Sequence, residues 1–587
     1  MDRRRFVVTS ASVGAVVAAV AAGCSGKLGS GGGSGPIDAL LDAGVGAGTK
    51  RITVQYATTT IQGKKFRGRT YDGIIPGPTI VTRPGSSVDV DIVNRLPPNP
   101  AATCPKGPMM VPDIRTEEET MMGRPKRFRK AEGPFDCMNN PHEFNTTNLH
   151  THGIQTTPHL FQPLGTSDPM APLIGIRPGK HFRYNLPVPP NHPSGLHWYH
   201  PHHHGATDVQ VSNGMAGIIV VRGPIDEVPE IKAARELFVI VQTLNVNKSK
   251  TDPDTYDLEY EAYKSPKDGG YFVDSDYTMF TVATEVGSTR TNAQGVKWVV
   301  NDPDHESYTS YPPPVFNMQP GEVVRLRFLN GANQNTLPLI LPGFEVWQIG
   351  FDGVNLPKPT LKDMSGDVPG GLKPKNFIAA PVRMTVPGNR IEFLIKAPDK
   401  PGTYMFSSLK ADELHGPGEN IDFIQFVVSG AKKDMAIPTT LPATPREEPP
   451  IPSTVPKRTF TLSFNASEVK VLTGFEFLID NTLYDEMSVP TNVHLNDEEE
   501  WTIKNTTGAI HPFHIHVNSF QLVAINGVEK PGEIWDTFYV PPKSSTDLGY
   551  GSITIRLRFR EFTGKSVFHC HFLSHEDTGM MQNFTVH

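Results

Sequence analysis

The chain has 587 residues, a formal net charge of −6, 55 prolines and 53 glycines. Its length is too great for a single hydrophobic core and predicts about three to four domains. The weakly acidic balance, without a basic patch that carries interleaved aromatic residues, gives no reason to expect nucleic-acid binding. Many turn residues between short alternating runs predict an all-β chain built from sandwiches.

The N-terminus has the character of an export signal. Residues 2–8 (DRRRFVV) resemble a twin-arginine signal, and the apolar stretch that follows is too short to span a bilayer. Residues 21–24 (AAGC) resemble the processing site of a bacterial lipoprotein, in which Cys24 would carry the lipid after removal of residues 1–23. The segment 24–49 would then be a flexible tether. We expect an exported cell-envelope protein, periplasmic or on the outer face of the cytoplasmic membrane; simple cleavage and release is the alternative.

A strand motif recurs three times along the chain. It is GSSVDVDIVN at residues 85–94, GEVVRLRFLN at 321–330 and, in a shorter form, WTIKN at 501–505. Each copy alternates apolar and polar residues and stops at an asparagine, as a half-buried strand that enters a turn should. The repeat predicts equivalent strands in three β-sandwich domains.

The positions of proline-rich and charged segments predict the domain borders. The predicted domains are residues 50–225, 226–437 and 457–587, with a proline-rich linker at 438–456. Between residues 226 and 435 only His305 and His415 occur, so we expect the middle domain to act as a spacer.

An insertion at residues 97–146 precedes the first histidine motif. It carries a charge run, for which a solvated loop is the default expectation. Its methionine pairs, 109–110 and 121–122, could bind cuprous ions or simply fill packing gaps. Cys104 and Cys137 also lie here; an oxidising compartment favours a disulfide between them, worth roughly 3–4 kcal/mol in the loop-entropy account, and two free thiols are the alternative.

The 21 histidines are concentrated in pairs of the form H-x-H. The pairs are His150/His152, His200/His202, His514/His516 and His569/His571, and His511 precedes the third pair. This spacing places both rings on one face of a strand. One such pair is weak evidence, but four in one chain strongly predict metal binding.

The last pair is split by a cysteine. On an extended strand Cys570 faces one way, while His569 and His571 face the other. A thiolate with imidazole partners and a weak thioether is the ligand set of a blue-copper site, and His575 and Met580 follow closely. The opposite-facing histidines would hold different coppers, so an electron that leaves the sulfur crosses few bonds. A surface histidine patch beside a structural cysteine is the alternative.

With Asp72-Gly73, the PGPT segment at 76–79 and Trp198-Tyr199 before the second pair, these motifs resemble those of a three-domain multicopper oxidase of the laccase type. The resemblance runs from about residue 50 to the C-terminus, with the four copper motifs in order. It implies three cupredoxin-like Greek-key β-sandwich domains and four copper ions: one type 1, one type 2 and two type 3. The type 2 and type 3 ligands fall in the first and last domains, so the trinuclear site must form where these domains meet.

The resemblance assigns the copper ligands residue by residue. The type 1 copper would be bound by His511, Cys570 and His575, with Met580 axial. The type 2 copper would be bound by His150 and His514, and the type 3 pair by His152, His200, His202, His516, His569 and His571. Because His197, His203 and His204 flank the second motif, a register shifted to His202/His204 is an alternative. The Trp-Tyr-His context favours His200 and His202.

The resemblance implies four one-electron oxidations of a small reducing substrate, coupled to reduction of O₂ to two waters. O₂ reduction consumes protons, and carboxylates near the cluster are natural donors. Glu576 directly follows His575, and Asp168 resembles the acid that follows the first motif in several relatives. A salt bridge and a turn cap are their respective alternatives.

The donor is expected to be a phenol or an aromatic amine. A metallo-oxidase for Cu(I), Fe(II) or Mn(II) is the alternative enzyme, and a non-catalytic copper-binding protein is the alternative outside enzymes. An axial Met580 predicts a low-to-medium redox potential, because a sulfur donor stabilises oxidised copper. Donor identity and oligomeric state are left open by the sequence.

Overall fold

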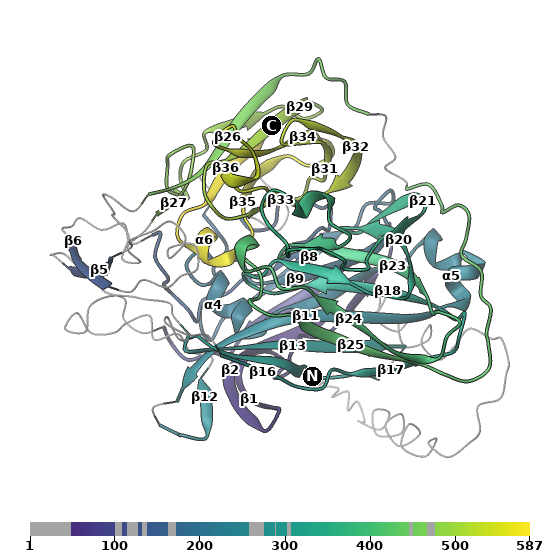
Figure 1. Cartoon of the computed structure of the whole chain (residues 1–587). Helices are drawn as coiled ribbons and strands as arrows, with labels where there is room; N and C mark the ends of the chain where they lie inside the picture. Colours follow the sequence, from purple (N-terminus) through teal and green to yellow (C-terminus); the bar gives the residue numbers. More distant parts are fainter. Residues whose placement is uncertain are drawn as a thin grey trace, which may run out of the picture.

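Figure 1 shows the computed structural model, which consists mostly of strands and confirms the all-β expectation. The structure describes residues 49–99, 109–113, 127–131, 138–161, 172–249, 251–257, 275–287, 289–301, 307–444, 450–465 and 476–587. Predictions for the N-terminal signal, Cys24, Cys104, Cys137 and Asp168 fall outside these residues. Within them the α-helices are α4 (Thr207–Ser212), α5 (Pro229–Ala233) and α6 (Leu573–Asp577). No helix in these ranges is long and apolar enough to cross a bilayer.

One continuous sheet of fourteen strands crosses the predicted border at residue 225. Its N-terminal strands are β1 (Lys50–Ile61), β2 (Lys64–Tyr71), β4 (Ser87–Asn94) and β8 (His181–Pro187). Its later strands are β11 (Arg235–Lys248), β12 (Thr255–Asp257), β13 (Tyr277–Val286), β14 (Thr289–Arg290), β15 (Gln294–Val300), β16 (Ser307–Ser310), β18 (Val323–Asn330), β20 (Glu345–Phe351), β21 (Val354–Lys362) and β23 (Arg390–Lys396). Strand β12 pairs with both β2 and β11 and thereby joins the two groups. The predicted borders therefore stay predictions.

Smaller sheets complete the N-terminal and middle regions. The N-terminal sheet has the order β3 (Ile80–Thr82), β10 (Gly217–Val221), β9 (Gly195–His200) and β7 (His150–His152). The middle sheet has the order β17 (Val315–Met318), β25 (Ile421–Val428), β24 (Gly402–Ser408), β19 (Leu337–Ile340) and β22 (Arg383–Thr385). In the insertion, β5 (Met109–Asp113) pairs with β6 (Arg127–Ala131), so part of the expected loop forms a two-stranded sheet. The 3-10 turns are η1 (Pro224–Glu227), η2 (Phe377–Ala379), η3 (Asp412–Leu414) and η4 (Lys543–Ser545).

The C-terminal region, yellow in Figure 1, contains two sheets. The larger has the order β27 (Glu476–Ile479), β26 (Lys457–Asn465), β29 (Glu498–Asn505), β34 (Gly551–Arg558), β31 (Phe520–Ile525) and β32 (Val528–Trp535). The smaller has the order β28 (Thr491–Val493), β36 (Met581–Val586), β35 (Gly564–Cys570), β30 (His511–Ile515) and β33 (Thr537–Val540). Their facing side chains, including Trp501, Phe513 and Phe568, form a buried apolar core.

The three copies of the repeated motif form β4, β18 and β29, and each has the same pairing. Each strand lies parallel to the first long strand of its region, β1, β11 or β26. Each also lies antiparallel to a later strand, β8, β23 or β34. The repeat in the sequence therefore corresponds to a repeat in topology.

The asparagine that ends each copy has the same structural role. The Oδ1 atoms of Asn94, Asn330 and Asn505 accept hydrogen bonds from the backbone N–H two residues later, at 3.0, 3.2 and 2.9 Å. Their Nδ2 atoms donate to backbone carbonyls of the segments that follow. Each side chain is fully buried. Asparagine suits this position because it satisfies a donor and an acceptor where the ladder stops.

Candidate metal centres

The first candidate centre lies at the end of β35 and contains the cysteine. The Sγ of Cys570 is 3.4 Å from Nδ1 of His511 and 3.7 Å from Nδ1 of His575. These two Nδ1 atoms are 3.2 Å apart, so the three atoms form a compact triangle. His511 begins β30, and His575 lies in α6. The triangle brings together the three residues predicted for the type 1 site.

The surroundings of this triangle favour a bound cation. All three side chains are buried, and burial raises the pKa of the Cys570 thiol. A thiolate here therefore needs a positive charge, and a metal ion provides one. Met580 is fully buried; its carbonyl accepts from the Cys570 N–H, and its N–H donates to the His575 carbonyl. These bonds hold the backbone of Met580 beside Cys570 and His575, and its axial role stays a prediction.

The second candidate centre collects the histidine pairs of the N- and C-terminal regions. The Nε2 of His569 lies 3.1 Å from Nε2 of His202 and 3.1 Å from Nε2 of His516. The Nε2 of His571 lies 3.2 Å from Nδ1 of His152. These contacts bring the N- and C-terminal regions together at one site. The sequence predicted a trinuclear copper site where these two regions meet.

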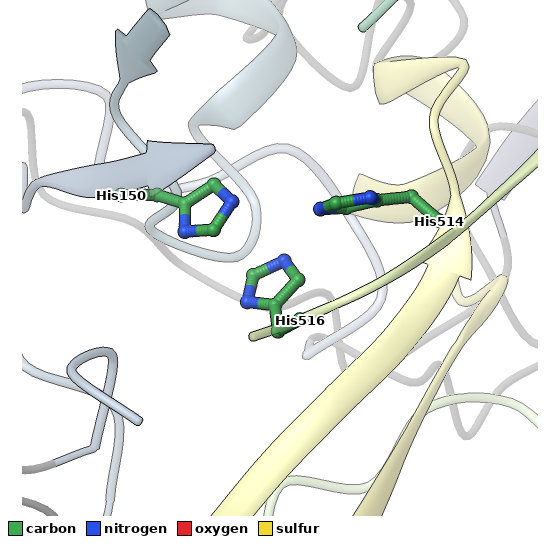
Figure 2. A group of neighbouring side chains, drawn as sticks. All are labelled: His150, His514 and His516. Atoms are coloured by element: carbon green, nitrogen blue, oxygen red, sulfur yellow. The ribbon is translucent and has the colours of Figure 1, made fainter. Parts of the chain in front are cut away.

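Two further groups belong to this second centre. His150, His514 and His516 place ligand nitrogens within 4.8 Å of one another, and Figure 2 shows their rings turned towards a common space. His150, His152 and His200 form another such group. Strand pairing produces this arrangement, because His150 lies opposite His200 on β7 and β9, and His514 lies opposite His569 on β30 and β35.

The unpaired ring nitrogens of this centre are suitable copper ligands. Several buried ring nitrogens have no hydrogen-bond partner among the described residues: both nitrogens of His150, Nε2 of His200 and His514, and Nδ1 of His571. Buried polar atoms are rarely left unpaired unless a ligand or ion satisfies them. The other ring nitrogens of His200 and His514 lie 2.8 Å from the carbonyls of Pro201 and Asp536. Such bonds orient a metal-binding imidazole.

Burial and neighbouring imidazoles lower the pKa of the clustered histidines well below the usual value, as for His150, His152 and His202. The rings are therefore neutral at physiological pH. Neutral imidazole is the form that ligates copper.

Glu576 lies between the two centres, as predicted for an acid near the cluster. Its carboxylate oxygens are 3.3 Å from Nδ1 of His202 and 3.2 Å from Nδ1 of His569. The hydroxyl of Thr207, at the start of α4, donates to it at 3.1 Å. Burial, followed by the neighbouring Asp577, raises the pKa of Glu576 well above its usual value. Glu576 therefore favours its protonated form, in contact with two of the cluster histidines.

A buried ion-pair network behind the cluster was not predicted. Asp536 places Oδ1 3.2 Å from Nε2 of His152, and Arg390 donates to both its carboxylate oxygens at 2.9 and 2.5 Å. Asp352 accepts from the backbone N–H groups of Arg390 and Thr537 at 2.9 and 3.1 Å. These residues come from the middle and C-terminal regions, so the middle region contributes directly to the site.

The glycine of the first histidine motif makes room for this network. Gly153 has φ +87°, and a Cβ atom there would lie 2.1 Å from Nη2 of Arg390. A side chain at position 153 would therefore collide with the guanidinium. Gly388, in the middle region, similarly leaves space for the rings of His152 and His571.

His415, also in the middle region, reaches the first centre. Its half-buried ring stacks on Phe572 at a centroid distance of 4.4 Å and lies 5.9 Å from the ring of His575. Phe477 stacks on the His575 ring at a centroid distance of 3.8 Å. His415 has φ +58°, a left-handed conformation that non-glycine residues seldom adopt. No signal in the sequence beyond its histidine identity indicated this contact.

The three histidines that flank the second motif have other partners. His204 lies 3.2 Å from Oδ1 of Asn139, and His203 lies 3.3 Å from Glu143. His197 packs against His192. The geometry thus brings His200 and His202 into the cluster and supports the unshifted register.

Two family models with the description "Multicopper oxidase" match the chain, one over residues 136–225 and the other over residues 450–587. These ranges contain both candidate centres. The multicopper oxidase of Staphylococcus haemolyticus is 25% identical over 79% of this chain and 82% of its own length. A laccase of Bacillus stratosphericus is 24% identical over 87% of this chain and 89% of its own length.

Solved structures share the fold over nearly the whole chain. A laccase-like multicopper oxidase from Ochrobactrum sp. has a TM-score of 0.60 at 20% identity and covers 93% of this chain and 97% of that chain. A multicopper oxidase from Campylobacter jejuni, described as a metallo-oxidase, has a TM-score of 0.59 at 19% identity and covers 92% of both chains. The chain therefore belongs to the multicopper oxidase family and is an oxidoreductase that reduces O₂ with electrons from a reducing substrate.

Proposed function

We propose that this enzyme is laccase-like and takes electrons from phenols or aromatic amines. The observation that carries the proposal is the aromatic surrounding of His575, which Phe477, Phe572 and His415 contact through their rings. The rings of Phe477 and Phe572 are buried, whereas the His415 ring is partly exposed, and an aromatic donor gains from stacking on such a ring. The other imidazole of the triangle is less suited to contact a donor, because its Nε2 lies 2.8 Å from the buried hydroxyl of Thr507.

The proposed ligand sets follow the two centres. His511, Cys570 and His575 would hold the type 1 copper with Met580 axial, and His150 and His514 the type 2 copper. The type 3 pair would be held by His152, His200, His202, His516, His569 and His571. When bound, the copper ions supply the redox chemistry by passing single electrons from the donor to O₂. Cys570 connects through the backbone to both neighbouring histidines, so the chain provides a short path between the centres.

Glu576 has two proposed roles. Its contacts with Nδ1 of His202 and His569 orient both rings, and its raised pKa favours the protonated form that can donate a proton. Asp168 remains a proposed second donor, on the strength of its place after the first histidine motif.

Oxygen uptake by the copper-loaded protein tests the donor class. Phenols and aromatic amines should support faster turnover than Cu(I), Fe(II) or Mn(II). His415→Asn, which tolerates the left-handed backbone, should raise KM for the phenol while leaving the blue absorption band intact. Asp412→Asn, at an exposed position in the same turn, is the matched control. Faster turnover with a metal ion, or an unchanged phenol KM in His415→Asn, would contradict the aromatic site.

A metallo-oxidase is the second candidate. It is supported by the description of the Campylobacter jejuni structure and by exposed carboxylates, Asp412 and Glu413, in the turn that ends at His415. Carboxylates attract cationic donors. The same uptake panel separates the two functions, and failure to consume O₂ with every donor would favour a non-catalytic copper protein.

Export with a lipid anchor on Cys24 is also proposed from the N-terminal sequence. Mass spectrometry of the protein purified from its native membrane fraction should find a lipid-modified N-terminal cysteine. An unmodified N-terminus at another residue would indicate release instead.

A further inference from the structure

Arg383, on β22, is a partly buried cation that forms no direct ion pair among the described residues, although the charge of Glu533 acts on it. Its Cζ lies 4.9 Å from the ring centre of Trp535 and 5.8 Å from that of Phe351. Its Nε and Nη2 atoms are closed off from solvent and have no hydrogen-bond partner in the ranges that the structure describes. The aromatic faces attract the guanidinium, but they do not satisfy its N–H groups.

Other buried arginines in the chain are paired. Arg325 and Arg327 both bond to Glu392, and Arg390 bonds to Asp536. The carboxylates raise the pKa of Arg390, whereas burial lowers the pKa of Arg383. A buried charge is normally compensated by an opposite charge. Arg383 lacks the direct carboxylate contact that these three arginines have, and Glu533 offsets the effect of burial only in part.

A cavity of about 260 Å³ adjoins this guanidinium. It lies between the middle and C-terminal regions, and its walls include Phe377, Phe538 and Tyr539. Lys530 and Glu533 also line it, so two cations, Arg383 and Lys530, and one anion face the cavity. The cavity therefore combines aromatic walls with an excess of positive charge.

Lys362 adds to this excess. Burial lowers the pKa of Lys362, and Arg383 is the next cause. The two cations are thus close enough to repel each other, and a bound anion would relieve this repulsion.

We propose that this cavity is a binding site for a small aromatic carboxylate, held by the guanidinium of Arg383 and separate from both copper centres. Guanidinium N–H groups match the two oxygens of a carboxylate, and aromatic walls suit a planar ring. Cavities of this kind, apolar with a few convergent polar groups, are typical of small-molecule sites.

The site would also connect to the network behind the cluster. Asn389 lines the cavity and donates to Asp352 and to the Thr537 carbonyl at 2.8 Å. A ligand that bridges the middle and C-terminal regions should therefore stabilise their interface.

Isothermal titration of the copper-loaded full-length protein with benzoate tests the site. We expect saturable binding of one benzoate and a rise in melting temperature. Arg383→Met keeps a long side chain over Trp535 but removes the charge and the donors, so it should weaken binding by about tenfold or more. A second cleft shares Lys530 and Glu533 with this cavity and is also lined by Lys358. Lys358→Met removes one exposed positive charge from that cleft and should bind benzoate as the wild type does.

Several outcomes would overturn the proposal: no saturable binding by the wild type, equal affinity in Arg383→Met, or sulfate binding as tightly as benzoate. If Arg383→Met does not fold, benzoate binding by Arg383→Lys tests the proposal instead. It retains the charge but loses the planar fork, so weaker benzoate binding supports the site and unchanged affinity contradicts it. The blue absorption band should be the same in every folded variant.

Discussion

Replacing Arg390 with methionine removes the guanidinium that joins the middle region to the C-terminal part of the copper site. In the wild type it donates to both oxygens of Asp536 and, at 2.8 Å, to the Gly388 carbonyl. The Arg390 side chain is fully buried, and that of Asp536 is 7% exposed. The variant leaves the carboxylates of Asp536 and Asp352 in a buried place without their cation.

The size of the effect follows from this burial. Removing one partner of a buried, hydrogen-bonded ion pair costs about 3–5 kcal/mol, because the remaining charge is uncompensated. An exposed pair gives the contrast: Arg51 bonds Asp91 at 3.2 Å, but its side chain is 69% exposed. Arg51→Met should therefore cost about 0–1 kcal/mol.

Urea unfolding of the copper-loaded proteins, followed by tryptophan fluorescence, measures both losses. Copper analysis adds a second readout, since Asp536 contacts His152 and its carbonyl lies 2.8 Å from Nδ1 of His514. Arg390→Met should lose copper from the trinuclear centre while keeping the blue colour of the type 1 site. A loss below about 1 kcal/mol with full copper content would refute the reasoning, because the network would then neither stabilise the interface nor hold the histidines.

Three further outcomes are expected. Met580→Leu should raise the type 1 potential in a spectroelectrochemical titration, since the sulfur donor that stabilises oxidised copper is lost; an unchanged or lower potential would contradict an axial role. Glu576→Gln should slow O₂ reduction, in stopped-flow measurements, by on the order of 100-fold while reducing the type 1 rate much less; equal effects on both steps would reject proton donation. Burial and Asp536 raise the pKa of Asp352 from 3.8 to about 7, so its contribution to stability is complete below pH 3.8 and is lost as the pH rises towards 7. Asp352→Asn should flatten this part of the curve of unfolding free energy against pH, and an unchanged slope would show that another group titrates.

Local patterns predicted the strands and the histidine pairs that the fold brings together. The alternating repeat that ends at Asn94, Asn330 and Asn505 was confirmed as three strands with the same pairing. A strand of period two also sends Cys570 to one centre and His569 to the other, as the spacing predicted. Such inferences succeed because they depend only on the geometry of a few consecutive residues.

The sequence by itself determined the all-β class, the repeated strand and the groups able to bind copper, since period and side-chain chemistry are local properties. The tertiary structure alone decided that Arg390 and Asp352 support the cluster, that His415 reaches His575, and that Nε and Nη2 of Arg383 have no hydrogen-bond partner among the described residues. Arg390 and Asp536 are 146 positions apart. Contacts over such separations arise from the packing of one sheet on another, and no pattern within a single strand encodes them.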